Sequence, residues 1–184
     1  MRMQIREKAQ LMSAAEIDRT LVRLAHEIVE RNNGIGQIAL VGIRRRGVPL
    51  AERLAQRLEQ IEKTRPAVGT LDVTLYRDDL STIGPQPVVK EEPIGFAVDG
   101  KTVILVDDVL YTGRTTRASM NALFNYGRPA RVQLCVLIDR GWRELPIEAT
   151  YVGRHLQTAA DEIVEVRLRE TDSEERVMLV EKVS

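Results

Sequence analysis

Asp107 and Asp108 stand side by side directly after a short apolar run, and no other pair in the chain has a clearer capacity for chemistry. The four residues before them, Val103 to Val106, are all aliphatic, which is typical of a strand buried in a sheet. Two adjacent carboxylates are costly to bury unless they are solvated, paired or bound to a ligand. At the carboxyl end of a buried parallel strand they would face a ligand crevice, where they could accept hydrogen bonds from sugar hydroxyls and help to hold a Mg²⁺ ion.

The segment from Tyr111 to Thr116, with the sequence YTGRTT, follows the aspartates and opens a predicted helix. Gly113 permits close approach of the backbone to a ligand, and the first amides of the helix can donate hydrogen bonds to a phosphate. Carboxylates for a ribose beside a loop for a phosphate describe a ribose 5-phosphate site. The alternative is that the aspartates cap a turn and Thr115 or Thr116 caps an exposed helix, but that alternative does not require all of these features together.

The elements that must position this site are short apolar strands that alternate with amphipathic helices. Ser13 and Glu16 have the spacing of a capping box at the start of the first helix. The expected strands are 37–43, 68–76, 101–107 and 131–138, and the expected helices are 13–33, 48–61 and 114–126. This order predicts an α/β fold with a central, mainly parallel sheet flanked by helices and joined by right-handed crossovers.

Two segments depart from the alternating pattern. Residues 77 to 100 are polar and interrupted by glycine and proline, and connections of this length are uncommon unless they serve a function such as an active-site lid. We therefore expect a flexible loop at about 78–99. The tail, about 149–184, contains three short strand-like pieces, YVG, EIVEVRL and RVMLV, which predict a small flap over the sheet.

The composition is that of an ordinary globular protein. A chain of 184 residues, 43% hydrophobic and 29% charged, predicts a single domain over 1–184. The 27 basic and 27 acidic residues cancel, so net charge gives no sign of a nucleic-acid partner. No apolar run approaches the ~20 residues of a membrane span, and Cys135, the only cysteine, lies in an apolar stretch typical of a core. We expect a cytoplasmic protein with no membrane partner and no disulfide.

The segment VILVDDVLYTGRT resembles the PRPP-binding signature of the type I phosphoribosyltransferases. Further segments extend the resemblance over nearly the whole chain to one subfamily, the bifunctional pyrimidine-operon attenuation regulators and uracil phosphoribosyltransferases. These segments are RLAHE (23–27), VGIR (41–44) with RG (46–47), VTLYRDD (73–79), DRG (139–141) and RELPI (143–147). The resemblance implies a type I phosphoribosyltransferase fold with a C-terminal flap, or hood.

The resemblance also implies roles for the residues of the signature. Asp107 and Asp108 would be the catalytic pair that binds the ribose of PRPP and its Mg²⁺. Arg44 and Arg45 would meet the pyrophosphate, although a solvated turn is the alternative for them. The remaining residues of the signature would hold the 5-phosphate and complete the PRPP and UMP site: Val109, Leu110, Tyr111, Thr112, Gly113, Arg114 and Thr115.

Three more residues are assigned by the same resemblance. Arg77 would belong to the lid, with an ion pair to a neighbouring aspartate as the alternative. Arg140 would line the base end of the site. Val164 could present main-chain groups to the pyrimidine, or it could simply pack in the core.

Tyr111 bears on the choice of base. Purine-specific relatives typically have an aspartate immediately before the Thr-Gly of the phosphate loop, so a tyrosine there favours a pyrimidine. Two departures from the subfamily concern the same end of the site: Trp142 stands where a histidine is usual, and segment 155–160 follows the usual flap only loosely.

The subfamily binds the leader of pyrimidine-operon messenger RNA when UMP is present, and this implies an RNA-binding surface. Arg19, Arg23 and His26 share one face of the predicted first helix, and with Arg143 they are the candidates. The residues alone favour a solvated helix face. A purely catalytic salvage enzyme is the alternative function, and the resemblance suggests homodimers that pair into homotetramers.

Overall fold

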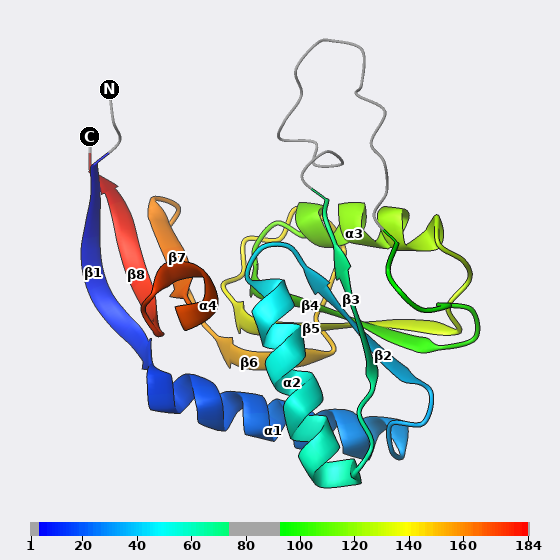
Figure 1. Cartoon of the computed structure of the whole chain (residues 1–184). Helices are drawn as coiled ribbons and strands as arrows, with labels where there is room; N and C mark the ends of the chain where they lie inside the picture. Colours follow the sequence, from blue (N-terminus) through cyan, green and yellow to red (C-terminus); the bar gives the residue numbers. More distant parts are fainter. Residues whose placement is uncertain (1–3, 74–92, 184) are drawn as a thin grey trace.

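The computed structural model describes residues 4–73 and 93–183 of the chain. Its main sheet has five parallel strands in the order β3-β2-β4-β5-β6. The strands are β2 (Ile38–Ile43), β3 (Ala67–Leu71), β4 (Thr102–Leu110), β5 (Arg131–Asp139) and β6 (Tyr151–His155). Figure 1 shows α1 (Ala14–Asn32) and α2 (Gly47–Glu62) on one face of this sheet and α3 (Arg114–Phe124) on the other. The predicted α/β architecture is confirmed.

Helix α1 forms where the sequence predicts it. The amide of Glu16 donates to the Ser13 hydroxyl at 3.3 Å, as in half of a capping box, and Asn33 ends the helix in the left-handed conformation. Its apolar face, including Leu21 and Leu24, is buried. The helix is therefore fixed at both ends by local sequence and along its length by packing.

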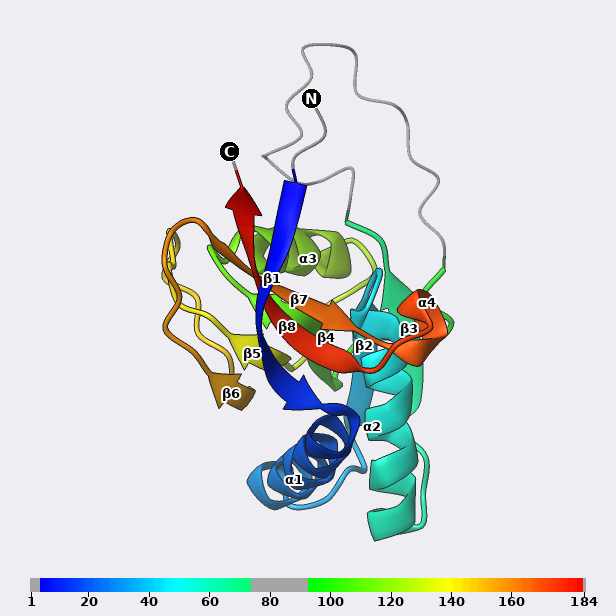
Figure 2. The same ribbon diagram turned by 90° about the vertical axis from the view of Figure 1, so that its left-hand side faces the viewer.

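A second, antiparallel sheet stands beside the first, with the strand order β1-β8-β7. It consists of β1 (Gln4–Ser13), β7 (Glu162–Arg167) and β8 (Arg176–Val183), and the short helix α4 (Arg169–Asp172) connects β7 to β8. Figures 1 and 2 show that the first and last strands run side by side, so both ends of the chain lie at the same tip. We call this sheet together with α4 the hood.

The hood differs from the predicted flap at 149–184 in two respects. The piece YVG belongs to β6, which pairs with β5 in the main sheet because the buried Tyr151 lies opposite the buried Cys135. The missing strand comes instead from the N-terminus. The sequence of β1 carries no strand signal, because it has no alternation of apolar and polar residues. The strand is joined to β8 by ion pairs such as Arg6 with Glu181.

Two apolar clusters, one on each side of the main sheet, form the core. The cluster beneath α1 and α2 includes Leu24 and Leu54 and runs without a break into the hood through Val166 and Val177. The cluster beneath α3 includes Leu105. The hood is thus held against the body by the same core as two of the helices.

The predicted flexible loop at 78–99 falls largely on residues 74–92, which are outside the described part of the chain. The stretch that follows is packed: Ile94 and Val98 are buried in the cluster beneath α3. The Ile94 side chain lies so close to Gly69 of β3 that a Cβ there would come within 2.7 Å of it. Residues 93–99 of the predicted loop are therefore held against the body, because Ile94 and Val98 are buried there.

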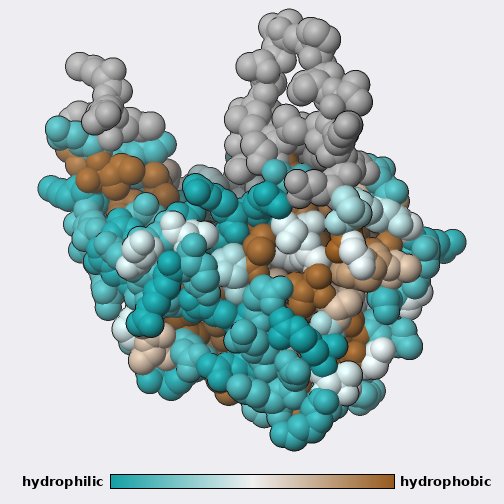
Figure 3. All heavy atoms as spheres, in the orientation of Figure 1, coloured by the Kyte–Doolittle hydropathy of each residue, from teal (hydrophilic) through white to brown (hydrophobic). Residues whose placement is uncertain are grey.

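In the described part of the chain, no helix combines the length and the apolar character needed to cross a membrane. Most of the face in Figure 3 is hydrophilic, and the apolar atoms on it form small separate patches. Cys135 is buried in β5, as its apolar neighbours predict.

Candidate functional site

A pocket of about 750 Å³ opens at the carboxyl ends of β2 and β4, beside the start of α3 and under β7 of the hood. Every residue predicted to bind substrate lines it, except Arg77, which lies outside the described residues. The predicted residues in its wall are Arg44, Arg45, Asp107, Asp108, Val109, Leu110, Tyr111, Thr112, Gly113, Arg114, Thr115, Arg140 and Val164. Segments that are far apart in the sequence are therefore brought together around one space.

Asp107 and Asp108 lie near the end of β4, which extends to Leu110 and so is longer than predicted. Both aspartates are half-buried, and each is oriented by the next amide: Asp107 accepts from the amide of Asp108 at 2.9 Å, and Asp108 from that of Val109 at 2.8 Å. A carboxylate has about four acceptor positions, so such a bond orients it without exhausting it. The two side chains are held at the pocket wall with capacity to bind.

The phosphate loop ends at Gly113, whose φ of +93° lies in the left-handed region. A Cβ at this position would approach the Cβ of Ile147 at 3.3 Å. Gly113 has no side chain with which to cap α3, and the Arg114 amide donates to the Thr112 hydroxyl at 3.3 Å. The amides of Thr115 and Thr116 can donate to an anion. We call the loop and the start of α3 the phosphate cradle, after the role that the sequence predicts for them.

A second loop, residues 140–147, donates hydrogen bonds to carbonyl groups of the phosphate loop. The amide of Glu144 donates to the carbonyl of Thr112 at 2.9 Å. Arg143 donates to the carbonyl of Tyr111 at 2.7 Å and pairs with the Asp139 carboxylate at 2.8 Å. The guanidinium of Arg143 is therefore engaged beside the start of α3, on a different element from the α1 residues with which it was grouped as an RNA candidate.

The turn from Arg44 to Gly47 contributes three arginines to the pocket wall, and its Arg44–Arg45 peptide bond is cis. Gly47 allows the turn to lie against β4, because a Cβ there would come within 2.2 Å of the Val106 carbonyl oxygen. This contact places the turn beside the end of β4, next to the backbone of Asp107.

Arg46 also lines the pocket, although the sequence analysis did not assign it to the site. Its guanidinium makes two hydrogen bonds to the carboxylate of Asp172 in α4, Nε to Oδ2 at 3.0 Å and Nη2 to Oδ1 at 2.7 Å. These bonds raise the pKa of Arg46 and lower that of Asp172. The position of Arg46 between Arg45 and Gly47 could have suggested that it belongs to the site. Nothing in the sequence indicated that its partner lies 126 residues away.

Arg140 occupies the end of the pocket next to the hood and is only 5% exposed. It donates to the carbonyl of Glu162 at 2.8 Å and to the Thr158 hydroxyl at 3.2 Å, and its guanidinium lies 4.0 Å from the ring centroid of Tyr111. Burial lowers the pKa of Arg140. Val164 is buried in β7 and lines the same end of the pocket. It therefore packs in the core and also contributes to the pocket wall.

Trp142 adopts a left-handed φ of +62°, and its indole N–H donates to the carbonyl of Thr158 at 2.7 Å. The atypical residue and the atypical segment 155–160 are therefore bonded to each other. Both stand next to Arg140, at the end of the pocket under the hood.

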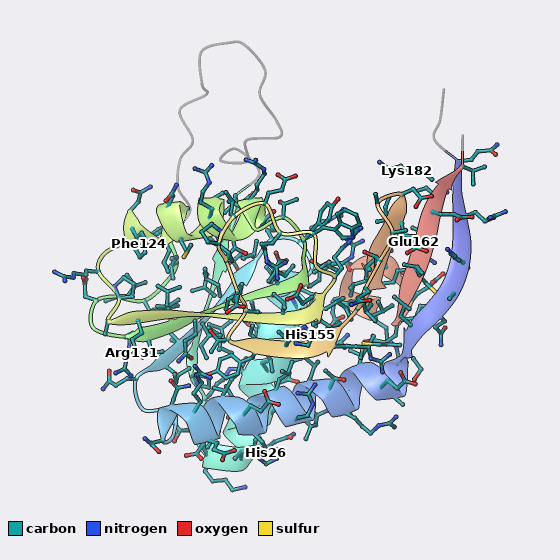
Figure 4. All side chains as sticks on the ribbon, turned by 180° about the vertical axis from the view of Figure 1, so that it is seen from behind. His26, Phe124, Arg131, His155, Glu162 and Lys182 are labelled. Atoms are coloured by element: carbon teal, nitrogen blue, oxygen red, sulfur yellow. The ribbon has the colours of Figure 1, made fainter. Side chains whose placement is uncertain are left out.

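Arg19, Arg23 and His26 are exposed on α1, as the helical spacing predicts. Figure 4 shows His26 on the opposite side of the main sheet from Phe124, at the end of α3. Arg23 is already bound to Glu27 at 2.6 Å and to the carbonyl of Gly153. These three residues lie outside the pocket, and Glu27 offsets the charge of Arg23.

The fold and the pocket are those of a phosphoribosyltransferase, and a profile of the phosphoribosyl transferase domain matches residues 10–171. Curated relatives define the group more narrowly. The chain is 59% identical to the Bifunctional protein PyrR of Pelotomaculum thermopropionicum over 96% of this chain and 97% of the relative. It is 54% identical to that of Clostridioides difficile over 95% and 99%. The chain belongs to the PyrR family of phosphoribosyltransferases.

Solved structures with much lower identity share the fold. A hypoxanthine-guanine phosphoribosyltransferase from Bacillus anthracis superposes with a TM-score of 0.71 at 21% identity, covering 98% of this chain and 100% of that one. A point variant of the hypoxanthine phosphoribosyltransferase from Trypanosoma cruzi, in a ternary substrates complex, gives a TM-score of 0.74 at 22% identity over 96% of both chains. These likenesses support the architecture and leave the choice of base open.

Proposed function

We propose that this protein transfers the phosphoribosyl group of PRPP to N1 of uracil, forming UMP and diphosphate, and that it regulates a pyrimidine operon by binding leader RNA in response to UMP. One observation carries the catalytic half. A single pocket joins two carboxylates at the end of β4, the start of α3 without a side-chain cap, and an arginine turn.

Each part of the pocket suits one part of PRPP. The start of α3, with Thr112 and Thr115, would bind the 5-phosphate through amides and hydroxyls. Asp107 and Asp108 would accept hydrogen bonds from the ribose hydroxyls. Arg44 and Arg45 would face the diphosphate.

In the reaction, the bond from C1 of the ribose to the diphosphate oxygen breaks and a bond from C1 to N1 of uracil forms. Fixed positive charge near the diphosphate stabilises the leaving group, and the N1 proton passes to solvent. No general base is assigned. Arg77, outside the described residues, belongs to the proposed lid that excludes water from the cationic C1 centre.

Asp107 and Asp108 fit a Mg²⁺ ion, which prefers carboxylate, phosphate and water oxygens. Among the described residues no group of three or more His, Cys, Asp and Glu could hold a metal, so in this proposal oxygens of the substrate and of water would complete the coordination. Bound Mg²⁺ would neutralise charge on the diphosphate.

The base would lie between the phosphate loop and the hood. Tyr111, with Arg140 stacked against its ring, occupies one side of that space, and Val164 presents the main chain of β7 on the other. A buried strand backbone offers a donor and an acceptor at fixed positions, which suits the polar edge of a pyrimidine.

The catalytic proposal is tested by replacing the aspartates. The double variant Asp107→Asn/Asp108→Asn keeps the shape of both side chains and removes both charges, and we expect it to abolish PRPP-dependent UMP formation. Asp18→Asn, on the exposed face of α1, is the control and should leave turnover unchanged. Turnover by the double variant at the level of the unmodified protein would remove these residues from the site.

The regulatory proposal is supported by the exposed basic face of Arg19, Arg23 and His26 on α1. Filter binding to pyrimidine leader RNA should show higher affinity with UMP than without it. Arg19→Ala should weaken that binding, whereas Arg65→Ala, just beyond the end of α2, should not. If the affinity for leader RNA were the same with and without UMP, the regulatory proposal would be rejected and only the salvage enzyme would remain.

We also propose that the protein works in the cytoplasm as a homodimer or homotetramer. The support for assembly is the family membership. Analytical ultracentrifugation with and without UMP measures the mass of the assembly directly, and a monomer under both conditions would contradict this part.

A further inference from the structure

The ion pair between Arg46 and Asp172 joins the arginine turn of the main sheet to the helix of the hood. The two hydrogen bonds are parallel and take one edge of the guanidinium, the Nε–H and one N–H of Nη2. A bidentate pair of this kind fixes the plane of the arginine as well as its position. The side chains are only 27% and 18% exposed, so solvent competes weakly with the pair.

Asp172 is itself held rigidly. Its Oδ2 also accepts from the amide of Leu168 at 2.9 Å and from the Thr171 hydroxyl at 2.7 Å. Both donors lie in the turn that forms α4, so the carboxylate is locked to the hood backbone. The position of Arg46 is consequently dictated by the hood and not only by its own turn.

The other edge of Arg46 remains for a ligand. A guanidinium has five N–H groups, and Asp172 takes two of them. The described residues accept from none of the other three, and Arg46 lines the pocket with Arg44 and Arg45. An arginine with one edge fixed and the other turned to a pocket is prepared for an anion.

We infer that Asp172 is a positioning residue for the diphosphate end of the substrate, acting through Arg46. This inference rests on the proposed function and deepens it, because it assigns a third arginine to the diphosphate and places the residue that orients it in the hood. Asp172 itself touches no substrate.

A purely structural role, in which the pair only fastens α4 to α2, can be separated from this one. Arg53 of α2 binds Glu170 of α4 with hydrogen bonds of 2.9 and 2.6 Å, and it also binds Glu175. This pair joins the same two elements, yet none of its residues lines the substrate pocket. Glu170→Gln is therefore a matched control for loss of one anchoring charge.

The experiment compares steady-state kinetics of five proteins: unmodified, Asp172→Asn, Arg46→Gln, the double variant of these two, and the control Glu170→Gln. Since one charge-assisted contact is lost, we expect Asp172→Asn to raise the KM for PRPP about tenfold and to leave the KM for uracil within about twofold. The double variant should be no worse than Arg46→Gln, because Asp172 acts through Arg46. Glu170→Gln should match the unmodified protein in both KM values.

Additive losses in the double variant, equal increases in both KM values, or the same change in Glu170→Gln would each overturn the inference. Calorimetric titration with magnesium diphosphate alone gives a test that does not need turnover. If the unmodified protein forms no UMP, the proposed reaction fails. The inference then stands or falls on whether Asp172→Asn weakens diphosphate binding about tenfold.

Discussion

Gly113→Ala should damage the phosphate cradle in a way that separates its effect on the site from its effect on folding. Gly113 has a φ of +93° at the start of α3, and an added Cβ would meet Ile147 at 3.3 Å and Arg143 at 3.5 Å. Gly95 offers a matched control, because its φ is +95° and an added Cβ there meets nothing within 4 Å. The two alanine variants share the backbone strain and differ in what surrounds it.

The shared cost is about 1–2 kcal/mol, the penalty of a left-handed conformation for a residue with a Cβ. For a chain of this length it corresponds to a fall in Tm of roughly 2–8 °C. Gly113→Ala has a further local cost, because the loop must move by a few tenths of an ångström away from Ile147. That movement shifts the amides that would bind the 5-phosphate, and we expect the KM for PRPP to rise about tenfold or more.

Differential scanning calorimetry and PRPP saturation kinetics on both variants check this reasoning. Both proteins should melt earlier, and only Gly113→Ala should lose affinity for PRPP. Equal loss of affinity in Gly95→Ala would mean that general destabilisation, and not the geometry of the cradle, controls binding. An unchanged KM in Gly113→Ala would show that the loop tolerates the shift.

Three further predictions use other parts of the molecule. Burial raises the pKa of Cys135 to about 12, so iodoacetamide at pH 8 should label it only as fast as the protein unfolds; rapid labelling of the native protein would contradict its burial. Arg46 lowers the pKa of Asp172 below its ordinary 3.8, so the stability that Asp172→Asn removes, measured by urea unfolding, should be constant above about pH 5 and shrink as the pH falls below 3.8. A loss that is equally large at pH 2.5 would exclude the ionic contribution. Chelation with EDTA should stop UMP formation and added Mg²⁺ should restore it, whereas turnover in EDTA would separate Asp107 and Asp108 from metal binding.

Four of the five strands of the main sheet could be predicted because their signals are local. Strand β4 is a run of aliphatic residues, and α1 has a Ser13 cap and a regular apolar face. Strand β1 could not be predicted, since seven of its residues are exposed in succession and its partner, β8, lies at the other end of the chain. Its pairing depends on charges such as Glu7, which faces Arg167 and Arg176 across the sheet.

The same division holds within the site. Asp107 to Thr115 are contiguous, and the chemistry of a phosphate loop dictates their order, so a reader of the sequence can assign them. Arg46 and Asp172 lie in different layers of the molecule, and only the folded structure shows that the hood orients the arginine. Long-range ion pairs leave no periodic trace in a sequence.

The main sheet and the hood contribute different ends of the pocket, and this affects which base the protein can accept. The phosphoribosyltransferases of known structure that share this fold include purine enzymes at about one-fifth identity, so the fold by itself does not select the base. The proposed phosphate end consists of the end of β4 in the main sheet and the start of α3, which packs on that sheet. The proposed base end depends on Arg140, which donates to the carbonyl of Glu162 in the hood and lies over the ring of Tyr111. A change in the hood can therefore alter the space and polarity offered to the base while the contacts to PRPP stay intact, and base specificity should follow the hood more closely than the phosphate loop.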